Sequence, residues 1–168
     1  MIFLDYKYYY SNKNGQDDYG LKYIDELGYG YKCTKFKIEF PPQEQDVQPG
    51  MEYMMNPKPI FDNENYIGSG KLKGKVAIIT GGDSGIGRSV AVHYVKEGAK
   101  VVIVYFNEHK DAEYTKNYIE KLGGECLLIP GDLKDNKFCK RVIDETLNCY
   151  GKIDILVNNA GVQYQQKS

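Results

Sequence analysis

The chain has 168 residues, a length that suits one ordinary domain, or an incomplete domain with an extension. Its 22 Lys and Arg residues nearly balance 23 Asp and Glu residues, and the formal net charge of -1 argues against nucleic acid or an anionic membrane as a partner. The four cysteines show neither zinc-ligand spacing nor the density of a disulfide scaffold, and no apolar run near the start is long enough for a signal peptide or a membrane span. These features predict a soluble cytoplasmic protein with reduced thiols.

The first 40 residues are rich in tyrosine and follow neither the helical nor the strand period. Eight of the 16 tyrosines fall within residues 1–31. We expect no packed element in that stretch, and we interpret residues 1–40 as an N-terminal extension. It is either a poorly ordered tail or an aromatic arm that binds something, and upstream DNA translated from a misplaced start is a further alternative.

Residues 41–70 differ from the extension because proline and glycine dominate their pattern. Pro41-Pro42, Pro49-Gly50 and Pro57-Lys58-Pro59 fix φ angles and remove backbone donors, which excludes a regular hydrogen-bonded ladder. This segment is predicted to be an extended arm that ends in a flexible joint at Gly68-Ser69-Gly70.

Residues 71–168 alternate short apolar runs with helical patterns, as parallel sheets with crossover helices do. The predicted strands, each apolar enough to be buried on both faces, are Val76–Thr80, Val101–Tyr105, Cys126–Ile129 and Ile153–Val157. The element order is therefore βαβαβαβ.

Three amphipathic helices are expected between these strands, and glycine follows each of them. The first carries an apolar stripe from Ile86 to Val95, and the third begins near Asp135 and ends before Gly151. The side chains predicted to face inward from the second helix are Ala112, Thr115, Ile119 and Leu122. Those predicted to face inward from the third are Phe138, Val142, Ile143 and Thr146.

The sequence TGGDSGIGR, from Thr80 to Arg88, joins the first predicted strand to the first helix. Glycine at such a junction lets the backbone approach a pyrophosphate closely, and the free N–H groups and dipole of the helix favour an anion. This position predicts a phosphate-binding turn. Its glycines, Gly81, Gly85 and Gly87, are spaced GxxxGxG instead of the general GxGxxG.

With the preceding threonine, this spacing resembles the TGxxxGxG motif of the short-chain dehydrogenase/reductase family. Two further signals follow in the family's order: Gly131-Asp132-Leu133 after the third strand and Asn158-Asn159-Ala160-Gly161 after the fourth. From about Phe40 to Ser168, the chain is most similar to the bacterial general-stress and glucose/ribitol-type dehydrogenases. The resemblance implies an α/β fold with a Rossmann-type, doubly wound parallel sheet of order 3-2-1-4-5-6, truncated here after its fourth strand. Residues 71–168 would be the N-terminal half of this domain.

The resemblance also implies which residues bind a nicotinamide dinucleotide. Gly81, Gly85 and Gly87 would line the pyrophosphate, and Ile86 would add a backbone contact. Asp132 would accept a hydrogen bond from the adenine amino group, with a turn or helix-capping role as the alternative. The nicotinamide ribose would be bordered by Asn158 and Ala160, while Asn159 and Gly161 shape the turn; for the asparagine pair a purely structural role is equally open.

The choice between NAD and NADP depends on the end of the second predicted strand. Glu108 comes too late to receive the ribose 2'-hydroxyl as the acid of an NAD enzyme does. Ser84 and Phe106 occupy the two places where the family often puts a basic group for the 2'-phosphate of NADP. We therefore favour NAD.

The family's catalytic machinery is a serine and a Tyr-x-x-x-Lys pair, in which the lysine lowers the tyrosine pKa. That pair lies two βα units beyond the Asn-Asn-Ala-Gly turn, whereas the spacing occurs here only before the first predicted strand, at Tyr9 with Lys13 and at Tyr31 with Lys35. We assign no catalytic role to these residues. No metal site is expected either, since the two histidines, His93 on a helix and His109 in a turn, form no ligand set with other residues.

The sequence thus predicts the cofactor-binding half of an NAD(P)-dependent oxidoreductase that acts on an alcohol, a sugar or a carbonyl compound, inactive by itself. The alternatives are a non-catalytic nucleotide-binding remnant and a truncated gene product. Full-length relatives of this kind are often tetramers, which implies a homo-oligomer for the full-length relative, but the helices that build such interfaces are absent from this sequence. The fourth strand would be an open sheet edge, and we expect low solubility for that reason.

Overall fold

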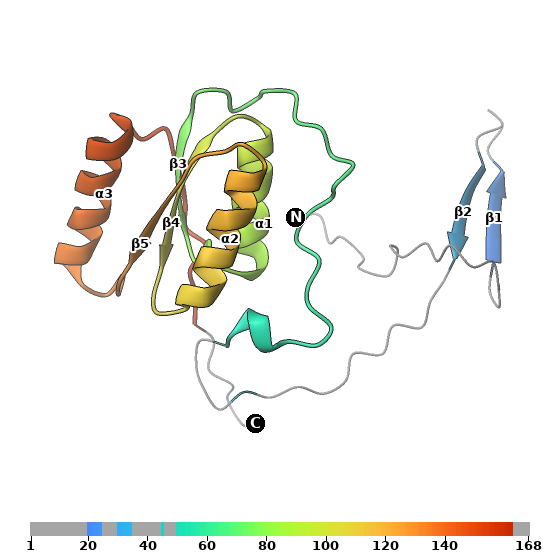
Figure 1. Cartoon of the computed structure of the whole chain (residues 1–168), viewed down its shortest axis with the longest axis horizontal. Coiled ribbons are helices and arrows are strands. Elements are labelled where there is room, and N and C mark those ends of the chain that lie inside the picture. Colours follow the sequence, from blue (N-terminus) through green and yellow to red (C-terminus); the bar gives the residue numbers. More distant parts are fainter. Residues whose placement is uncertain (1–19, 25–29, 35–44, 46–49, 163–168) are drawn as a thin grey trace. The chain divides into compact units, whose positions relative to one another are not determined.

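The computed structural model describes residues 20–24, 30–34, 45 and 50–162. The chain divides into two compact units, Met1–Pro42 and Gln43–Ser168. Figure 1 shows the elements of both units.

The first unit contains two antiparallel strands, β1 (Gly20–Ile24) and β2 (Gly30–Thr34). The expectation of no packed element among residues 1–31 is therefore wrong. Lys22 lies opposite Lys32 in the register, and each lysine is the centre of a short polar-apolar alternation. Such alternation is the sequence signal of a strand, but runs of five residues are too short to make it distinctive.

The second unit is built on four parallel strands in the order β5-β4-β3-β6. Their bounds are β3 (Val76–Thr80), β4 (Lys100–Tyr105), β5 (Cys126–Pro130) and β6 (Ile155–Val157). This order confirms the predicted Rossmann-type sheet with the first strand at its centre.

The strand β6 begins two residues later than predicted. Asp154 takes the place of a ladder residue there, because its carboxylate accepts the Val76 N–H at 2.9 Å while its own N–H donates to the Val76 carbonyl at 2.9 Å. Ile153 packs instead with the cluster beneath the third helix. At the sheet edge Leu156 is 56% exposed, so β6 is less buried than the apolar sequence suggests.

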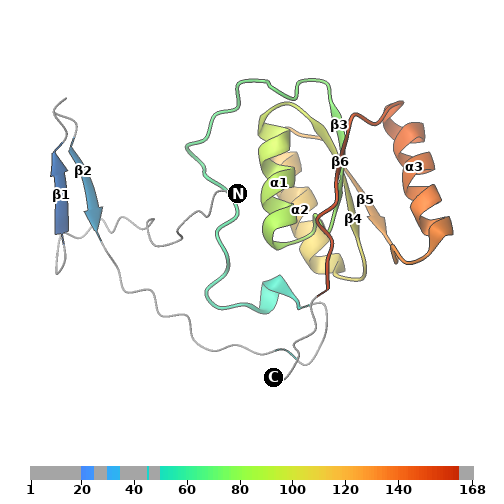
Figure 2. The same ribbon diagram turned by 180° about the vertical axis from the view of Figure 1, so that it is seen from behind.

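Helices cover both faces of the sheet, with α1 (Gly85–Lys96) and α2 (His109–Lys121) on one face and α3 (Asn136–Tyr150) on the other (Figures 1 and 2). The core between the sheet and α1 and α2 includes Ile79, Ala91, Val92, Val101, Ile103, Ala112 and Ile119. The core under α3 is formed around Ile78, Val102, Val104, Ile129, Phe138 and Val142. The doubly wound arrangement is thus confirmed.

Three of the predicted inward side chains point elsewhere. Ile86, the first residue of the predicted apolar stripe, is 76% exposed in the first turn of α1. Leu122 is exposed because α2 ends at Lys121 and Leu122 is its C-terminal cap. Ile143 is exposed because Phe138, Val142 and Thr146, spaced four residues apart, form the buried face of α3, and the next residue lies about 100° around the helix.

The arm contains a short 3-10 helix, η1 (Glu52–Met54), that the proline pattern does not predict. The arm ends at Gly68-Ser69-Gly70, which was predicted to be a flexible joint. This segment is instead packed against the C-terminal end of α1. The Glu97 carboxylate accepts the N–H groups of Ser69 at 3.0 Å and Lys71 at 2.9 Å. A Cβ atom on Gly68 would lie 1.8 Å from the Lys96 carbonyl oxygen, so only glycine allows this approach.

Candidate functional site

The glycine-rich turn lies where β3 meets α1, at the carboxyl edge of the sheet. Ser84 has an extended backbone and caps the helix, and Gly85 begins it with a φ of 51°, which favours glycine. A Cβ atom on Gly85 would meet nothing within 4 Å. The turn therefore has an open outer surface, on which the Ile86 side chain is also exposed.

The inner surface of the turn is closely packed. A Cβ atom on Gly87 would lie 1.9 Å from the Gly81 carbonyl oxygen and 2.6 Å from the Asn159 side-chain nitrogen. Because the first of these is a backbone atom, no side chain at Gly87 fits without displacing the turn. The three motif glycines thus serve close backbone packing on one side of the turn and access on the other.

The first turn of α1 has unbonded backbone donors beside this open surface, at the exposed Ile86 and at the buried Gly87. The Arg88 N–H donates to the Ser84 carbonyl at 3.0 Å, and the Gly85 N–H donates to the Glu52 carboxylate. Within the part of the chain that the structure describes, the N–H groups of Ile86 and Gly87 have no hydrogen-bond partner. Such groups and the helix dipole form an anion site, so the turn fits the phosphates of a dinucleotide.

The Asn-Asn-Ala-Gly turn after β6 is tied to the end of β3 through Thr80. The Thr80 hydroxyl donates to the Val157 carbonyl at 3.2 Å and accepts the N–H groups of Asn159 and Ala160 at 3.0 Å each. The Asn159 side chain also donates to the carbonyls of Thr80 and Gly81, both at 3.0 Å. Asn159 therefore ties the turn after β6 to the glycine-rich turn.

Asn158 and Ala160 are exposed at the same sheet edge. Parallel strands bring their carboxyl ends to one edge, and ligands of such sheets bind there. The structure thus brings these two residues to the edge that carries the glycine-rich turn.

Asp132 follows β5 at this edge of the sheet and is exposed. Its carboxylate accepts the Lys134 N–H at 2.9 Å, and its carbonyl accepts the Asp135 N–H at 3.0 Å. These two bonds stabilise the turn that follows β5. The neighbouring Gly131 N–H donates to the Tyr105 carbonyl at 2.8 Å, which fixes the turn to β4.

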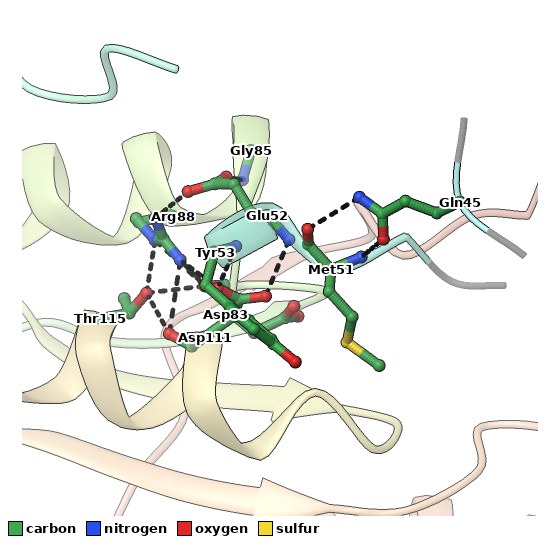
Figure 3. A network of polar contacts seen from close by, with 9 residues as sticks. All are labelled: Gln45, Met51, Glu52, Tyr53, Asp83, Gly85, Arg88, Asp111 and Thr115. Carbon is green, nitrogen blue, oxygen red and sulfur yellow. Dashed lines mark hydrogen bonds and ion pairs between the residues drawn. The ribbon is translucent and has the colours of Figure 1, made fainter. Parts of the chain in front are cut away.

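A buried charged network lies beneath the glycine-rich turn, and sequence reasoning missed it (Figure 3). Arg88 is 3% exposed and forms ion pairs with Glu52 of the arm and, at 3.6 Å, with Asp111 of α2. Its guanidinium also donates to Thr115 at 2.6 Å and to the Asp83 carbonyl at 2.7 and 3.1 Å. Burial raises the pKa of the Asp83 carboxyl, and the nearby acidic side chains raise it further.

Comparison with known proteins assigns the family. A family model described as short chain dehydrogenase matches residues 75–168. The chain belongs to the short-chain dehydrogenase family. Nicotinamide dinucleotides are the cofactors that this family implies.

Several proteins are similar in sequence to this member of the short-chain dehydrogenase family. An uncharacterized oxidoreductase, YhdF, of Bacillus subtilis is 58% identical over 127 residues, which cover 76% of this chain and 44% of that protein. General stress protein 39 of the same species is 55% identical over 80% of this chain and 47% of its own length. Glucose and ribitol dehydrogenase of Daucus carota is 44% identical over 76% of this chain and 46% of its own length. The chain thus spans slightly less than half the length of these relatives.

Solved structures are similar in fold as well as in sequence. A short chain dehydrogenase from Mycobacterium smegmatis superposes with a TM-score of 0.57 at 33% identity, covering 61% of this chain and 43% of that one. A hydroxysteroid dehydrogenase from Escherichia coli gives a TM-score of 0.52 at 37% identity, covering 55% of this chain and 38% of that one. These matches support the Rossmann-type architecture of the second unit.

The end of β4 is where short-chain dehydrogenases contact the adenosine ribose, by the resemblance given above. Phe106 is 50% exposed there, whereas Glu108 is buried and turns back to accept the Asn107 N–H at 3.0 Å. His109 begins α2 instead of lying in a turn, and its ring contacts the Tyr105 hydroxyl at 3.0 Å. The sequence pattern was misleading at His109 because the helix starts before its first buried residue.

Residues 20–24, 30–34, 45 and 50–162 hold no group of three His, Cys, Asp or Glu side chains that could bind a metal. Among the helices in these ranges, none has the length and apolarity needed to cross a bilayer. Cys126, Cys139 and Cys149 are free thiols.

Proposed function

We propose that this chain is the dinucleotide-binding half of an NAD(P)-dependent oxidoreductase that acts on an alcohol, a sugar or a carbonyl compound. The observation that carries the proposal is the pair of unbonded N–H groups, of Ile86 and Gly87, beside the open surface at Gly85. These donors would bind the pyrophosphate, and the bound cofactor would supply the hydride chemistry.

The remaining contacts in this proposal follow the family. Gly81 would line the pyrophosphate with the other two motif glycines, and Ser84 would lie beside the adenosine ribose. Asp132 would meet the adenine, and Asn158 and Ala160 would border the nicotinamide ribose. Their common position at the carboxyl edge of one sheet supports this assignment.

We infer a preference for NAD over NADP from the charges near the end of β4. The buried carboxyl groups of Asp83 and Glu108 lie close enough for Glu108 to raise the pKa of Asp83. Ser84 and Phe106 supply no positive charge at the places where the family puts one. A 2'-phosphate would meet two acidic groups and no cation from these positions.

Titration with NADH and NADPH, followed by nucleotide fluorescence, tests both parts of the proposal. We expect NADH to bind at least about tenfold more tightly, a difference of about 1.4 kcal/mol. Phe106→Arg is the matched variant, because the exposed side chain can change without disturbing the core, and it should improve NADPH binding. Equal affinities would contradict the preference, and no binding of either nucleotide would contradict the dinucleotide site itself.

We further propose that this chain alone does not turn over substrate, since the Tyr-x-x-x-Lys spacing occurs in it only before β3. An assay of hydride transfer with the purified chain tests this, and measurable turnover would refute it. The DNA downstream of Ser168 separates the alternatives: an in-register continuation with the catalytic residues supports truncation, and unrelated sequence supports a non-catalytic remnant. We also propose a cytoplasmic location, from the cysteine pattern, and a homo-oligomeric full-length relative, from the family.

A further inference from the structure

The Glu52 side chain connects the arm to the glycine-rich turn. Its carboxylate is buried, with a residue exposure of 7%, and uses both oxygens. One oxygen accepts the Gly85 N–H at the start of α1, and the other pairs with the Arg88 guanidinium one turn later (Figure 3). A single arm residue thus contacts the first and the fourth residue of α1.

Arg88 extends this contact to the other side of the turn. Its Nε and Nη2 atoms donate to the Asp83 carbonyl at 3.1 and 2.7 Å, and the Thr115 hydroxyl lies 2.7 Å from the same oxygen. Asp83 is two residues before Gly85, so the backbone is held on both sides of the position that carries the open surface. The Arg88 guanidinium is held in turn by its ion pairs with Glu52 and, at 3.6 Å, with Asp111.

The arm is itself fixed where Glu52 begins η1. The N–H groups of Glu52 and Tyr53 donate to the two carboxylate oxygens of Asp111, at 2.9 and 3.1 Å. The Gln45 side chain clamps the preceding Met51 backbone through bonds of 2.7 and 3.0 Å. Glu52 therefore presents its carboxylate from a segment that α2 holds in place.

We propose that Glu52 is a positioning residue, through which docking of the arm sets the geometry of the glycine-rich turn and thereby its affinity for a dinucleotide. Glu52 occupies only the Gly85 N–H, whereas the N–H groups of Ile86 and Gly87 have no partner among the described residues. The carboxylate thus holds the turn without filling the site. This inference rests on the proposed dinucleotide-binding function.

The test compares Glu52→Ala and Glu52→Gln with a control in the same arm, Asp62→Asn. Asp62 is also a buried acidic arm residue that pairs with α1, through Lys96 at 2.6 Å, but at the far end of the helix. The glutamine variant keeps an acceptor for the Gly85 N–H and loses the ion pair, and it serves if the alanine variant does not fold. For each full-length variant, NADH affinity is measured by fluorescence, and amide hydrogen exchange over residues 81–88 is measured without nucleotide.

We expect the dissociation constant for NADH to rise about tenfold in Glu52→Ala and about threefold in Glu52→Gln, since a hydrogen bond to a charged group is lost or weakened. Exchange over residues 81–88 should become faster in both variants. Asp62→Asn should change the dissociation constant less than about twofold and leave exchange in the turn unchanged.

Three results would overturn the inference. Unchanged affinity and exchange in the Glu52 variants would show that Glu52 does not fix the turn, and tighter binding would show that its carboxylate competes with phosphate. An equal loss of affinity in Asp62→Asn would show that arm docking in general is responsible. If the unaltered chain bound no dinucleotide, the proposed function would fail, while the exchange data would still decide whether Glu52 fixes the turn.

Discussion

The Thr80 hydroxyl is the point at which the two loops of the candidate site are joined, and replacing it tests how firmly they are held. Thr80→Val keeps the shape of the side chain and suits a strand. It removes one donated bond, to the Val157 carbonyl, and two accepted bonds, from the N–H groups of Asn159 and Ala160. Thr80 is 7% exposed, so water does not readily replace the hydroxyl.

The expected loss of stability follows from what each partner does afterwards. The Asn159 N–H keeps a second acceptor, the Val157 carbonyl at 3.1 Å, whereas the exposed Ala160 N–H reaches water. The net effect is therefore smaller than three full hydrogen bonds. At about 1 kcal/mol for a typical bond, we expect a decrease of about 2 kcal/mol in the free energy of unfolding.

Urea unfolding, followed by far-UV circular dichroism, measures this decrease against a matched variant, Thr146→Val. Thr146 is fully buried on α3, and its hydroxyl donates only to the Val142 carbonyl at 2.6 Å, one turn earlier in the same helix. That carbonyl retains its helical bond, so this variant should lose less than about 0.5 kcal/mol. If the two variants were equally stable, the Thr80 hydroxyl would not join the loops as described.

Three further predictions concern pH, the glycine-rich turn and the sheet edge. The hydrogen bond from Tyr66, with backbone N–H groups, lowers the pKa of Glu97 from 4.5 to about 2. The Glu97 carboxylate therefore contributes fully to the free energy of unfolding above about pH 4.5, and this contribution is lost as the pH falls towards 2. Measuring the unfolding midpoint as a function of pH tests this, and Glu97→Gln should abolish this part of the pH dependence. Gly87→Ala should prevent NADH binding, because the added Cβ atom would lie 1.9 Å from the Gly81 carbonyl oxygen; binding at the original affinity would refute the packing argument. Leu156→Lys should reduce aggregation in light-scattering measurements by adding charge to the exposed edge strand β6, and unchanged scattering would locate the cause elsewhere.

The sheet and its glycine-rich turn were predictable because each has a local signal. Strands covered on both faces must be apolar along their whole length, and Val76–Thr80 and Lys100–Tyr105 are buried at nearly every position. The turn is marked by glycines at positions where the structure allows no side chain, such as Gly87. These constraints act on neighbouring residues and are therefore visible in the sequence.

The network beneath the turn has no such signal. Glu52 and Arg88 are 36 residues apart, and no local sequence pattern around either residue predicts that they pair. The proline pattern of the arm predicts an extended backbone, but it does not predict which helix surface the arm packs against. The exposed Ile143 shows the same limit on a smaller scale, because its neighbour Val142 has similar hydrophobicity and only the direction of α3 decides which of them is buried.

The positions of the arm contacts give the arm a structural role in the nucleotide-binding unit. Glu52 meets the N-terminal end of α1, Asp62 meets Lys96 near its C-terminal end, and Gly68 packs on the last turn. A helix of 12 residues is about 18 Å long, and the ten residues from Glu52 to Asp62 can span that distance. The arm therefore contacts α1 near both of its ends. Since α1 carries both the proposed phosphate donors and the residues that hold the arm, we expect a shift of the arm to displace those donors.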